Sequence, residues 1–142
     1  TTKESLKRWV DGYQNPLQFK WAIVFNNEVV GSIDVVHLEE KLDAVEIGYA
    51  LSRKCWGKGI MTEALIAVID YLIEEAGCNR VAARHDVNNP ASGKVMLKAG
   101  MTYEGTLRQY GKNNQGICDM AYYSIIKADL LKEEEKTDVS DL

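Results

Sequence analysis

The sequence of 142 residues contains few cysteines, histidines and prolines. Its three cysteines, Cys55, Cys78 and Cys118, are widely spaced and include no C-x-x-C pair. This spacing argues against a disulfide framework and against a zinc site, and it is typical of reduced thiols in a cytoplasmic protein. The two histidines, His37 and His85, stand apart from each other, and we assign neither of them a catalytic or metal-binding role.

Long apolar runs and an excess of positive charge are also absent. No run approaches the roughly 20 residues that a membrane span needs, and the first residues lack the basic-then-apolar pattern of a signal peptide. The formal net charge of −4 provides no basic field for nucleic acid and suits a cationic, amine-bearing partner better. We therefore expect a soluble, cytoplasmic protein that binds neither membrane nor nucleic acid.

The end of the sequence differs in composition from the rest. Residues 132–136 read K-E-E-E-K, and the residues that follow are mostly polar. A run of this kind is typical of a solvated tail. The remaining length fits one domain with its own core. We therefore expect a single domain over residues 1–131 and a polar tail over residues 132–142.

Hydrophobic periodicity predicts a mixed α+β fold. Three strands precede the central helix and two follow the last one, which argues against an uninterrupted doubly wound sheet. The third strand, the central helix and the fourth strand would form a right-handed parallel crossover. The expected helices are Thr2–Tyr13, Ile60–Ala76 and Pro90–Ala99, and the expected strands are Phe19–Phe25, Glu28–Val36, Val45–Leu51, Arg80–Asp86, Met101–Tyr110 and Ile117–Ile126.

A turn with two glycines lies between the third strand and the central helix. Gly57 and Gly59 remove side chains where a ligand could approach the backbone closely. The unpaired amides and the dipole of the following helix favour an anion there, and Arg53, Lys54 and Lys58 add positive charge. The turn therefore matches a pyrophosphate, while a tight connection with surface lysines is the structural alternative.

Two familiar phosphate-binding motifs do not fit this turn. The Walker pattern requires G-K-[ST], but Gly59 is followed by Ile60. The dinucleotide fingerprint requires a third glycine where Thr62 stands. A mononucleotide P-loop and a Rossmann site are therefore both excluded.

Residues 54–59, K-C-W-G-K-G, resemble motif A of the GNAT acetyltransferases, [Q/R]-x-x-G-x-[G/A], with lysine in the first place. With Thr62-Glu63-Ala64, the segment looks more particularly like the RimJ/RimL type of ribosomal-protein N-terminal acetyltransferase. The resemblance covers nearly the whole chain beyond Trp21. Its further matches are Glu46–Tyr49, Asn88–Ser92, Lys98–Met101, Glu104–Arg108 and Asp119–Ile126.

The resemblance implies a GNAT acyl-CoA N-acyltransferase fold. This fold has a mixed, mostly antiparallel sheet, a splayed parallel pair of strands and flanking helices. The family also has a strand and a further helix before the helix expected at Thr2–Tyr13, so we expect the domain to be N-terminally incomplete. The sequence does not determine the oligomeric state, and a homodimer is the assembly that we consider.

The cofactor implied by the resemblance is acetyl-CoA, lying between the splayed strands. Backbone groups of Ala50 and Leu51 would pair with the pantetheine arm, and Asn89 would hold its amide. Lys98 would reach the ribose 3′-phosphate, although a lysine near a helix end also complements the dipole. The amides that would hold the pyrophosphate belong to Lys54, Cys55, Trp56, Gly57, Lys58, Gly59, Ile60 and Met61.

The reaction implied by the resemblance is direct transfer to an amine, which needs a base. An N-terminal amine has a pKa near 7.7 to 8.0, so a water-relayed carboxylate suffices. We assign this role to Glu46, which matches a position often acidic in the family; a surface glutamate paired with a neighbouring strand is the alternative. Tyr110 and Asp119 are secondary candidates for ordering the acceptor. Gly111 stands where the RimL-type branch carries an acidic residue.

The departing thiolate needs a proton donor. Many GNAT enzymes use a tyrosine seven residues after the asparagine, which here is Met96 and cannot donate. The RimL-type branch uses a serine, and Ser92 occupies that place. N-capping of the short helix is a compatible second role for Asn89 and Ser92. Cys55 has no neighbouring histidine or aspartate motif, so a covalent acetyl-cysteine is not expected.

The acceptor is the least determined part of the prediction. The resemblance favours the N-terminal α-amine of a protein. A small amine, such as an amino acid, a polyamine or an antibiotic, would use the same cofactor motif. A CoA-binding regulatory module without catalysis is the third alternative, and it applies if neither Glu46 nor Ser92 faces the acetyl group.

Overall fold

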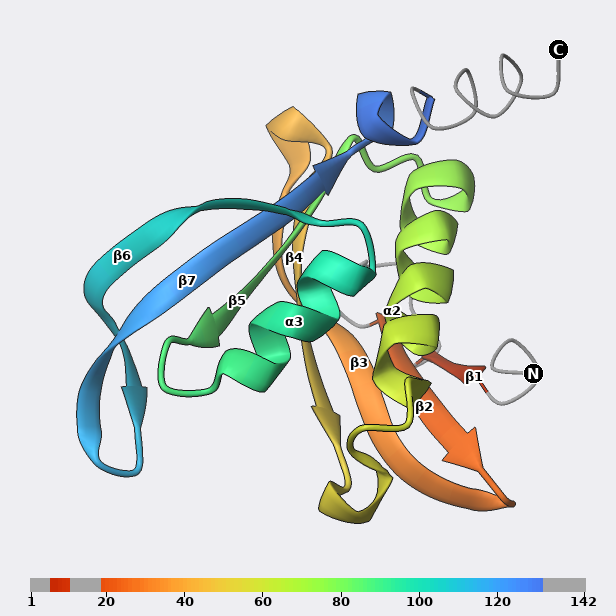
Figure 1. Cartoon of the computed structure of the whole chain (residues 1–142). Helices are drawn as coiled ribbons and strands as arrows, with labels where there is room; N and C mark the ends of the chain where they lie inside the picture. The colour runs from red at the N-terminus through yellow and green to blue at the C-terminus, as the bar shows by residue number, and fades with distance from the viewer. Residues whose placement is uncertain (1–5, 11–18, 132–142) are drawn as a thin grey trace, which may run out of the picture.

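The computed structural model describes residues 6–10 and 19–131. Within these residues, seven strands form one sheet in the order β1-β2-β3-β4-β5-β7-β6, with the helices α2 and α3 and a helical segment at residues 127–131 (Figure 1). The polar tail expected over residues 132–142 lies outside the described residues. The bounds are β1 Leu6–Val10, β2 Phe19–Phe25, β3 Glu28–Glu39, β4 Ala44–Leu51, α2 Ile60–Asp70, β5 Arg80–Asp86, α3 Pro90–Lys98, β6 Thr102–Asn113 and β7 Gly116–Ile126.

The prediction of a helix over Thr2–Tyr13 is wrong for the part that the structure describes. Leu6–Val10 is a strand, β1, that pairs antiparallel with β2 at the edge of the sheet. The apolar spacing of this segment fits a helix, but five residues are too few to separate the two periods. The hydrogen-bond ladder offered by β2 decides the outcome. The rest of the predicted helix lies outside the described residues.

The remaining elements match the predicted mixed α+β order. Asn26 and Asn27 both have positive φ, 52° and 63°, as a tight two-residue hairpin turn between β2 and β3 requires. The predicted central helix over Ile60–Ala76 is α2 followed by a π-helical turn at Tyr71–Glu75. Strands β3, β6 and β7 are longer than predicted, because β3 pairs with β4 as far as Glu39 and the β6–β7 ladder continues to the pair Asn113↔Gly116.

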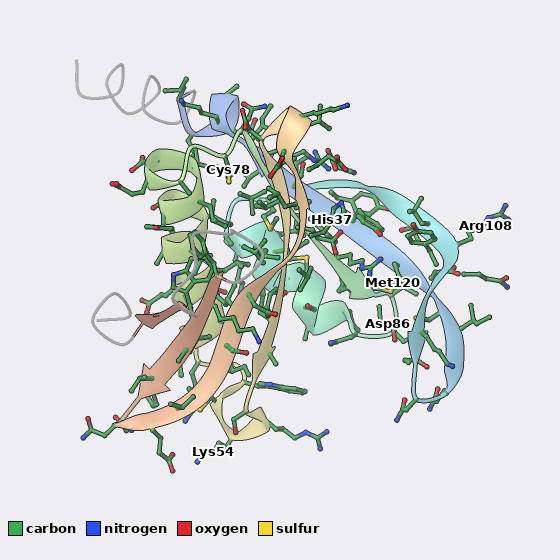
Figure 2. All side chains as sticks on the ribbon, turned by 180° about the vertical axis from the view of Figure 1, so that it is seen from behind. His37, Lys54, Cys78, Asp86, Arg108 and Met120 are labelled. Carbon is green, nitrogen blue, oxygen red and sulfur yellow. The ribbon has the colours of Figure 1, made fainter. Side chains whose placement is uncertain are left out.

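The apolar core lies between the sheet and one layer of helices. Both α2 and α3 cover the same face of the sheet (Figure 1), while Figure 2 shows the opposite face from behind. On α2, apolar residues at helical spacing form one buried stripe. These buried positions are Ile60, Met61, Ala64, Leu65, Val68 and Ile69. No helix in the described ranges is both long and apolar enough to cross a membrane.

The parallel pair β4–β5 separates after a short ladder. Its register pairs are Ala44↔Arg80, Val45↔Val81 and Glu46↔Ala82. Beyond Glu46, β4 stays paired with β3 as far as Leu51, whereas β5 stays paired with β7 as far as Asp86. The two strands therefore part in the middle of the sheet, as Figure 1 shows, and the predicted splayed parallel pair is confirmed.

Candidate functional site

A cavity of about 440 Å³ lies beside the end of β4, beyond the point where β4 and β5 cease to pair. Three segments form its walls: the end of β4, the glycine turn with the start of α2, and one side of α3. Its walls are mainly apolar, with a few polar groups among them. The lining residues are Tyr49, Ala50, Leu51, Cys55, Trp56, Gly57, Gly59, Ile60, Met61, Thr62, Asn89, Ala91, Ser92, Lys94, Val95 and Lys98.

The glycine turn presents bare backbone to this cavity. Gly57 and Gly59 have φ values of 76° and 77°, in the left-handed region that favours glycine. A Cβ placed on either residue would meet no atom within 4 Å, so the space in front of both is open. Gly59 also stands directly before α2, whose first-turn amides have no partner within the helix. The turn therefore combines open space with backbone donors, which is the chemistry of an anion cradle.

The basic side chains of the turn lie outside the cavity lining. The Lys54 ammonium donates a hydrogen bond of 2.9 Å to Glu28, which raises the pKa of Lys54. The Lys58 ammonium lies 5.9 Å from the centre of the Phe25 ring. Figure 2 shows Lys54 at the edge of the molecule. The side chains of these two lysines are therefore not placed to contact a ligand in the cavity. Only their backbone amides remain as candidates for holding the pyrophosphate.

Every other residue predicted to contact the cofactor lines the cavity, including Ala50, Leu51, Asn89 and Lys98. Sequence reasoning missed Tyr49, Thr62, Ala91, Lys94 and Val95. The α3 residues among them could have been found from helical spacing. Lys94 is one turn before Lys98, so both lie on the same side of the helix. The cavity is therefore lined by two lysines from α3 instead of by those of the turn.

Tyr49 and Ser92 form a contact across the opening. The Tyr49 hydroxyl lies 2.7 Å from Ser92 Oγ and 3.1 Å from the Ser92 carbonyl oxygen, within hydrogen-bonding distance of both. Burial raises the pKa of the Tyr49 phenol above its ordinary range, although the hydrogen bond with Ser92 acts in the opposite direction. Tyr49 therefore stays a neutral hydroxyl at physiological pH. The sequence placed it only on the apolar face of β4.

The predicted capping role of the α3 start is not observed. Asn89 stands at the N-cap position but makes no side-chain hydrogen bond to the helix, and Pro90 follows at the first turn. The Ser92 hydroxyl is directed to Tyr49 instead. The proline supplies the helical φ at the start of α3 without a cap. Both Asn89 and Ser92 therefore keep their side chains available to the cavity that they line.

Glu46 lies on the sheet face opposite to the helices. Its neighbours Val45 and Ile47 are 2% exposed and belong to the core, so strand alternation turns Glu46 the other way. The Glu46 carboxylate lies 3.3 Å from Nε of Arg84, and its side chain is 20% exposed. Glu46 is also the last β4 residue paired with β5, which places it where the strands part.

Tyr110 belongs to the surroundings of Arg84 and not to the cavity lining. Its ring centre lies 6.0 Å from the Arg84 guanidinium, which also donates a hydrogen bond of 2.9 Å to the Tyr122 hydroxyl. Asp119 accepts a hydrogen bond of 2.8 Å from the Gln109 amide, in an irregular part of β6 where Gln109 has a φ of 53°. Asp119 therefore shapes the backbone next to Tyr110, and Ser92 is the one predicted catalytic residue that lines the cavity.

The two histidines differ in their surroundings. His37 is exposed on β3, with Nε2 3.5 Å from Glu39. His85 is buried; its Nδ1 donates to the Asp86 carbonyl oxygen over 2.7 Å, and within the described part of the chain its Nε2 has no hydrogen-bond partner. A Cβ on Gly93 would lie 2.7 Å from that Nε2. His85 therefore fixes how closely α3 packs on β5.

The family model for an acetyltransferase (GNAT) domain matches residues 1–102. An uncharacterized N-acetyltransferase of Bacillus subtilis, YoaA, is 33% identical over 81% of the chain and 66% of its own length. The ribosomal-protein-serine acetyltransferase of Escherichia coli is 29% identical over 88% of the chain and 72% of its own length. The chain spans about two thirds of the length of the curated relatives it matches.

The solved structures point in the same direction. The structure of RimL, a ribosomal L7/L12 alpha-N-protein acetyltransferase in complex with coenzyme A, superposes with a TM-score of 0.72 and 28% identity. This match covers 76% of the chain and 61% of RimL. The family resemblance predicted from the glycine turn is thereby confirmed, together with the fold class. The chain belongs to the GNAT acetyltransferase family.

Proposed function

We propose that the protein transfers the acetyl group of acetyl-CoA to a primary amine, and that this amine is the N-terminal α-amine of a protein. The observation that carries the proposal is the cavity bounded by the end of β4, the glycine turn and α3, beyond the point where β4 and β5 cease to pair. One wall is the bare glycine turn and another holds a serine hydroxyl. Acetyl-CoA, when bound, supplies an activated acetyl thioester.

The cavity fits this cofactor because it offers hydrogen-bond donors, positive charge and open space in front of the backbone. The backbone of Gly57 and Gly59, with the first-turn amides of α2, would hold the pyrophosphate, because their Cβ positions are open. Lys94 and Lys98 from α3 would offset the charge of a further phosphate. The Leu51 carbonyl oxygen accepts a hydrogen bond of 2.9 Å from the Trp56 indole, and Ala50 and Leu51 also belong to the ladder with β3. The extended pantetheine arm would pair with the remaining backbone groups of these two cavity-lining residues.

Two groups of the chain would handle protons. Ser92 Oγ, one of the hydroxyls that line the cavity, would donate a proton to the departing thiolate. Glu46 would accept the proton of the amine, directly or through a water molecule, from the open face of the sheet where the strands part. Tyr110 and Arg84 border the same face and would order the acceptor.

A protein N-terminus is favoured over a small amine by the relatives. The E. coli relative is named a ribosomal-protein-serine acetyltransferase, and RimL is an alpha-N-protein acetyltransferase. The net charge of −4 also suits a cationic acceptor. We therefore expect a serine-initiated peptide to be a better acceptor than a free amino acid or a polyamine.

An acceptor screen that follows the release of free thiol from acetyl-CoA tests this function. Matched peptides that begin with serine, with a free or an acetylated N-terminus, are compared with spermidine and with free amino acids. Release that requires the free N-terminus supports the proposal. Release with small amines alone would assign the alternative acceptor class. Tight acetyl-CoA binding without transfer to any acceptor would make the protein a non-catalytic CoA-binding module.

A further inference from the structure

Tyr49 and Ser92 connect the two sides of the opening. Tyr49 lies near the end of β4, and Ser92 lies in the first turn of α3. The phenolic oxygen is within 2.7 Å of Ser92 Oγ and 3.1 Å of the Ser92 carbonyl oxygen. Both residues line the cavity. The serine hydroxyl is therefore held by a second hydroxyl that comes from a different element.

The number of protons limits what this pair can do. A phenol has one proton to donate, and a carbonyl oxygen only accepts. If Tyr49 donates to the carbonyl, the Ser92 proton is donated to Tyr49. If Tyr49 donates to Ser92 Oγ, the Ser92 proton is free to point into the cavity. Because Tyr49 stays a neutral phenol at physiological pH, it retains the proton that the second arrangement requires.

We propose that Tyr49 is a positioning residue for Ser92, which it holds by donating to Oγ so that the serine proton faces the ligand sulfur. This inference rests on the proposed function and extends it to a residue outside the predicted catalytic set. Ser92 remains the group that touches the ligand, and Tyr49 acts through it. The hydrogen bond from Tyr49 also stabilises negative charge on Oγ while Ser92 gives up its proton.

A purely structural role for Tyr49 would give a different result. The bond from Tyr49 to the Ser92 carbonyl ties β4 to α3. Loss of such a tie would lower the affinity for every ligand of the cavity equally. Loss of a positioning role would lower only the part of the affinity that comes from the sulfur-bearing end of the ligand. Coenzyme A and desulfo-coenzyme A, in which hydrogen replaces the thiol, differ only at that end and separate the two roles.

The binding test uses the wild type, Tyr49→Phe, Ser92→Ala and the double variant. Tyr103→Phe is a matched control, because its hydroxyl also makes a hydrogen bond of 2.7 Å, to Thr106, away from the cavity. Calorimetry measures the affinity of each protein for both ligands. We expect the wild type and the control to prefer coenzyme A by about three- to tenfold, the worth of one hydrogen bond. Tyr49→Phe and Ser92→Ala should both lose this preference.

A kinetic cycle gives a second readout. Tyr49→Phe should lower kcat by about tenfold with little change in the KM for acetyl-CoA, as expected when a proton donor is misplaced. In the Ser92→Ala background the same substitution should have no further effect on kcat, since Tyr49 acts through Ser92. Independent, additive losses would overturn the proposal, and so would a Tyr49→Phe variant that keeps the wild-type preference for coenzyme A.

The two proposals fail in different ways. A wild-type protein that transfers acetyl groups while Tyr49→Phe matches it in every readout would overturn the role of Tyr49 alone. A wild-type protein that binds neither ligand would overturn the proposed function, and with it the inference. Thermal unfolding of each variant, compared with Tyr103→Phe, shows whether the phenylalanine proteins are folded before either conclusion is drawn.

Discussion

The carboxylate of Glu46 and the guanidinium of Arg84 meet at 3.3 Å where β4 and β5 cease to pair. Arg84 is held in turn by the Tyr122 hydroxyl and lies beside the ring of Tyr110. The carboxylate is thus fixed in position on the open sheet face, and it is only partly exposed. The proposed function places the entering amine next to this carboxylate.

Glu46→Gln should lower turnover most strongly at low pH. An acceptor amine with a pKa near 7.7 to 8.0 is mostly protonated below that range, so the base matters more there. We expect a loss of about tenfold or more at pH 6.5 and a smaller loss at pH 9. A pH–rate profile with a saturating peptide acceptor measures this difference.

Glu104→Gln is the matched control for that experiment. It also removes one carboxylate from an ion pair of the sheet, that of Glu104 with Arg80. Its pH–rate profile should coincide with that of the wild type. If Glu46→Gln and Glu104→Gln give the same profile, Glu46 is a structural partner of Arg84 and another group, or water, accepts the proton.

The ion pair between Glu104 and Arg80 should make the free energy of unfolding depend on pH, and the Glu104→Gln variant tests this. The hydrogen bonds from Arg80, one of 3.0 Å, lower the pKa of Glu104 in the folded protein. A lowered folded-state pKa contributes stability above the unfolded pKa, near 4.3, and this contribution is lost as the pH falls through the folded value. Because both side chains are more than one third exposed, the pair contributes about 0.5 kcal/mol. Urea unfolding should therefore separate wild type and Glu104→Gln at pH 7 and not at pH 3.

Gly57→Ala should weaken acetyl-CoA binding by at least about tenfold, equal to about 1.4 kcal/mol. The added Cβ would enter the open space in front of the turn, and the backbone would have to leave its φ of 76° or bear the strain. Gly77→Ala is a close control, because Gly77 has a φ of 80°, equally open space and no part in the cavity lining. Both variants should lose about 1 kcal/mol of unfolding free energy. If calorimetry gives Gly57→Ala and Gly77→Ala the same affinity for acetyl-CoA, the turn is not part of the binding site.

Gly93→Ala should destabilise the protein by about 1 to 3 kcal/mol. Its Cβ would lie 2.7 Å from His85 Nε2 and 3.0 Å from the Tyr123 hydroxyl, so α3 would have to move away from the sheet. Alanine is the better helix former by about 1 kcal/mol, which acts in the opposite direction. Thermal unfolding measures the balance. A Gly93→Ala variant more stable than the wild type would show that α3 is free to shift. If Gly93→Ala is less stable, adding His85→Ala should recover part of the lost stability.

The strands and helices beyond residue 19 could be predicted because their local patterns agree with their tertiary surroundings. Alternating apolar residues define β4, a buried stripe defines α2, and Gly59 marks where α2 begins. The segment Leu6–Val10 could not be assigned, because its state depends on pairing with β2. The π-helical turn at Tyr71–Glu75 also follows from packing and has no signal in the sequence.

The residues that line the cavity were largely predictable, whereas the contacts between its segments were not. The glycine turn is contiguous, so its chemistry can be read from a few residues. The Tyr49–Ser92 contact joins residues that are 43 positions apart, and it depends on how α3 packs over the strand opening. The Glu46–Arg84 pair depends likewise on the register of β4 against β5. Neither relationship is encoded in a spacing along the chain.

The short β4–β5 ladder makes the sheet mechanically uneven. Three register pairs join β4 to β5, whereas β3 and β4 share a ladder from Gly31↔Leu51 to Glu39↔Ala44. The β4–β5 ladder is the shortest of the described sheet, so the fewest backbone hydrogen bonds resist a change in the angle between these two strands. We expect a ligand bound between the end of β4 and α3 to restrict that change, and therefore to slow hydrogen exchange in β4 and β5 beyond the residues that it contacts.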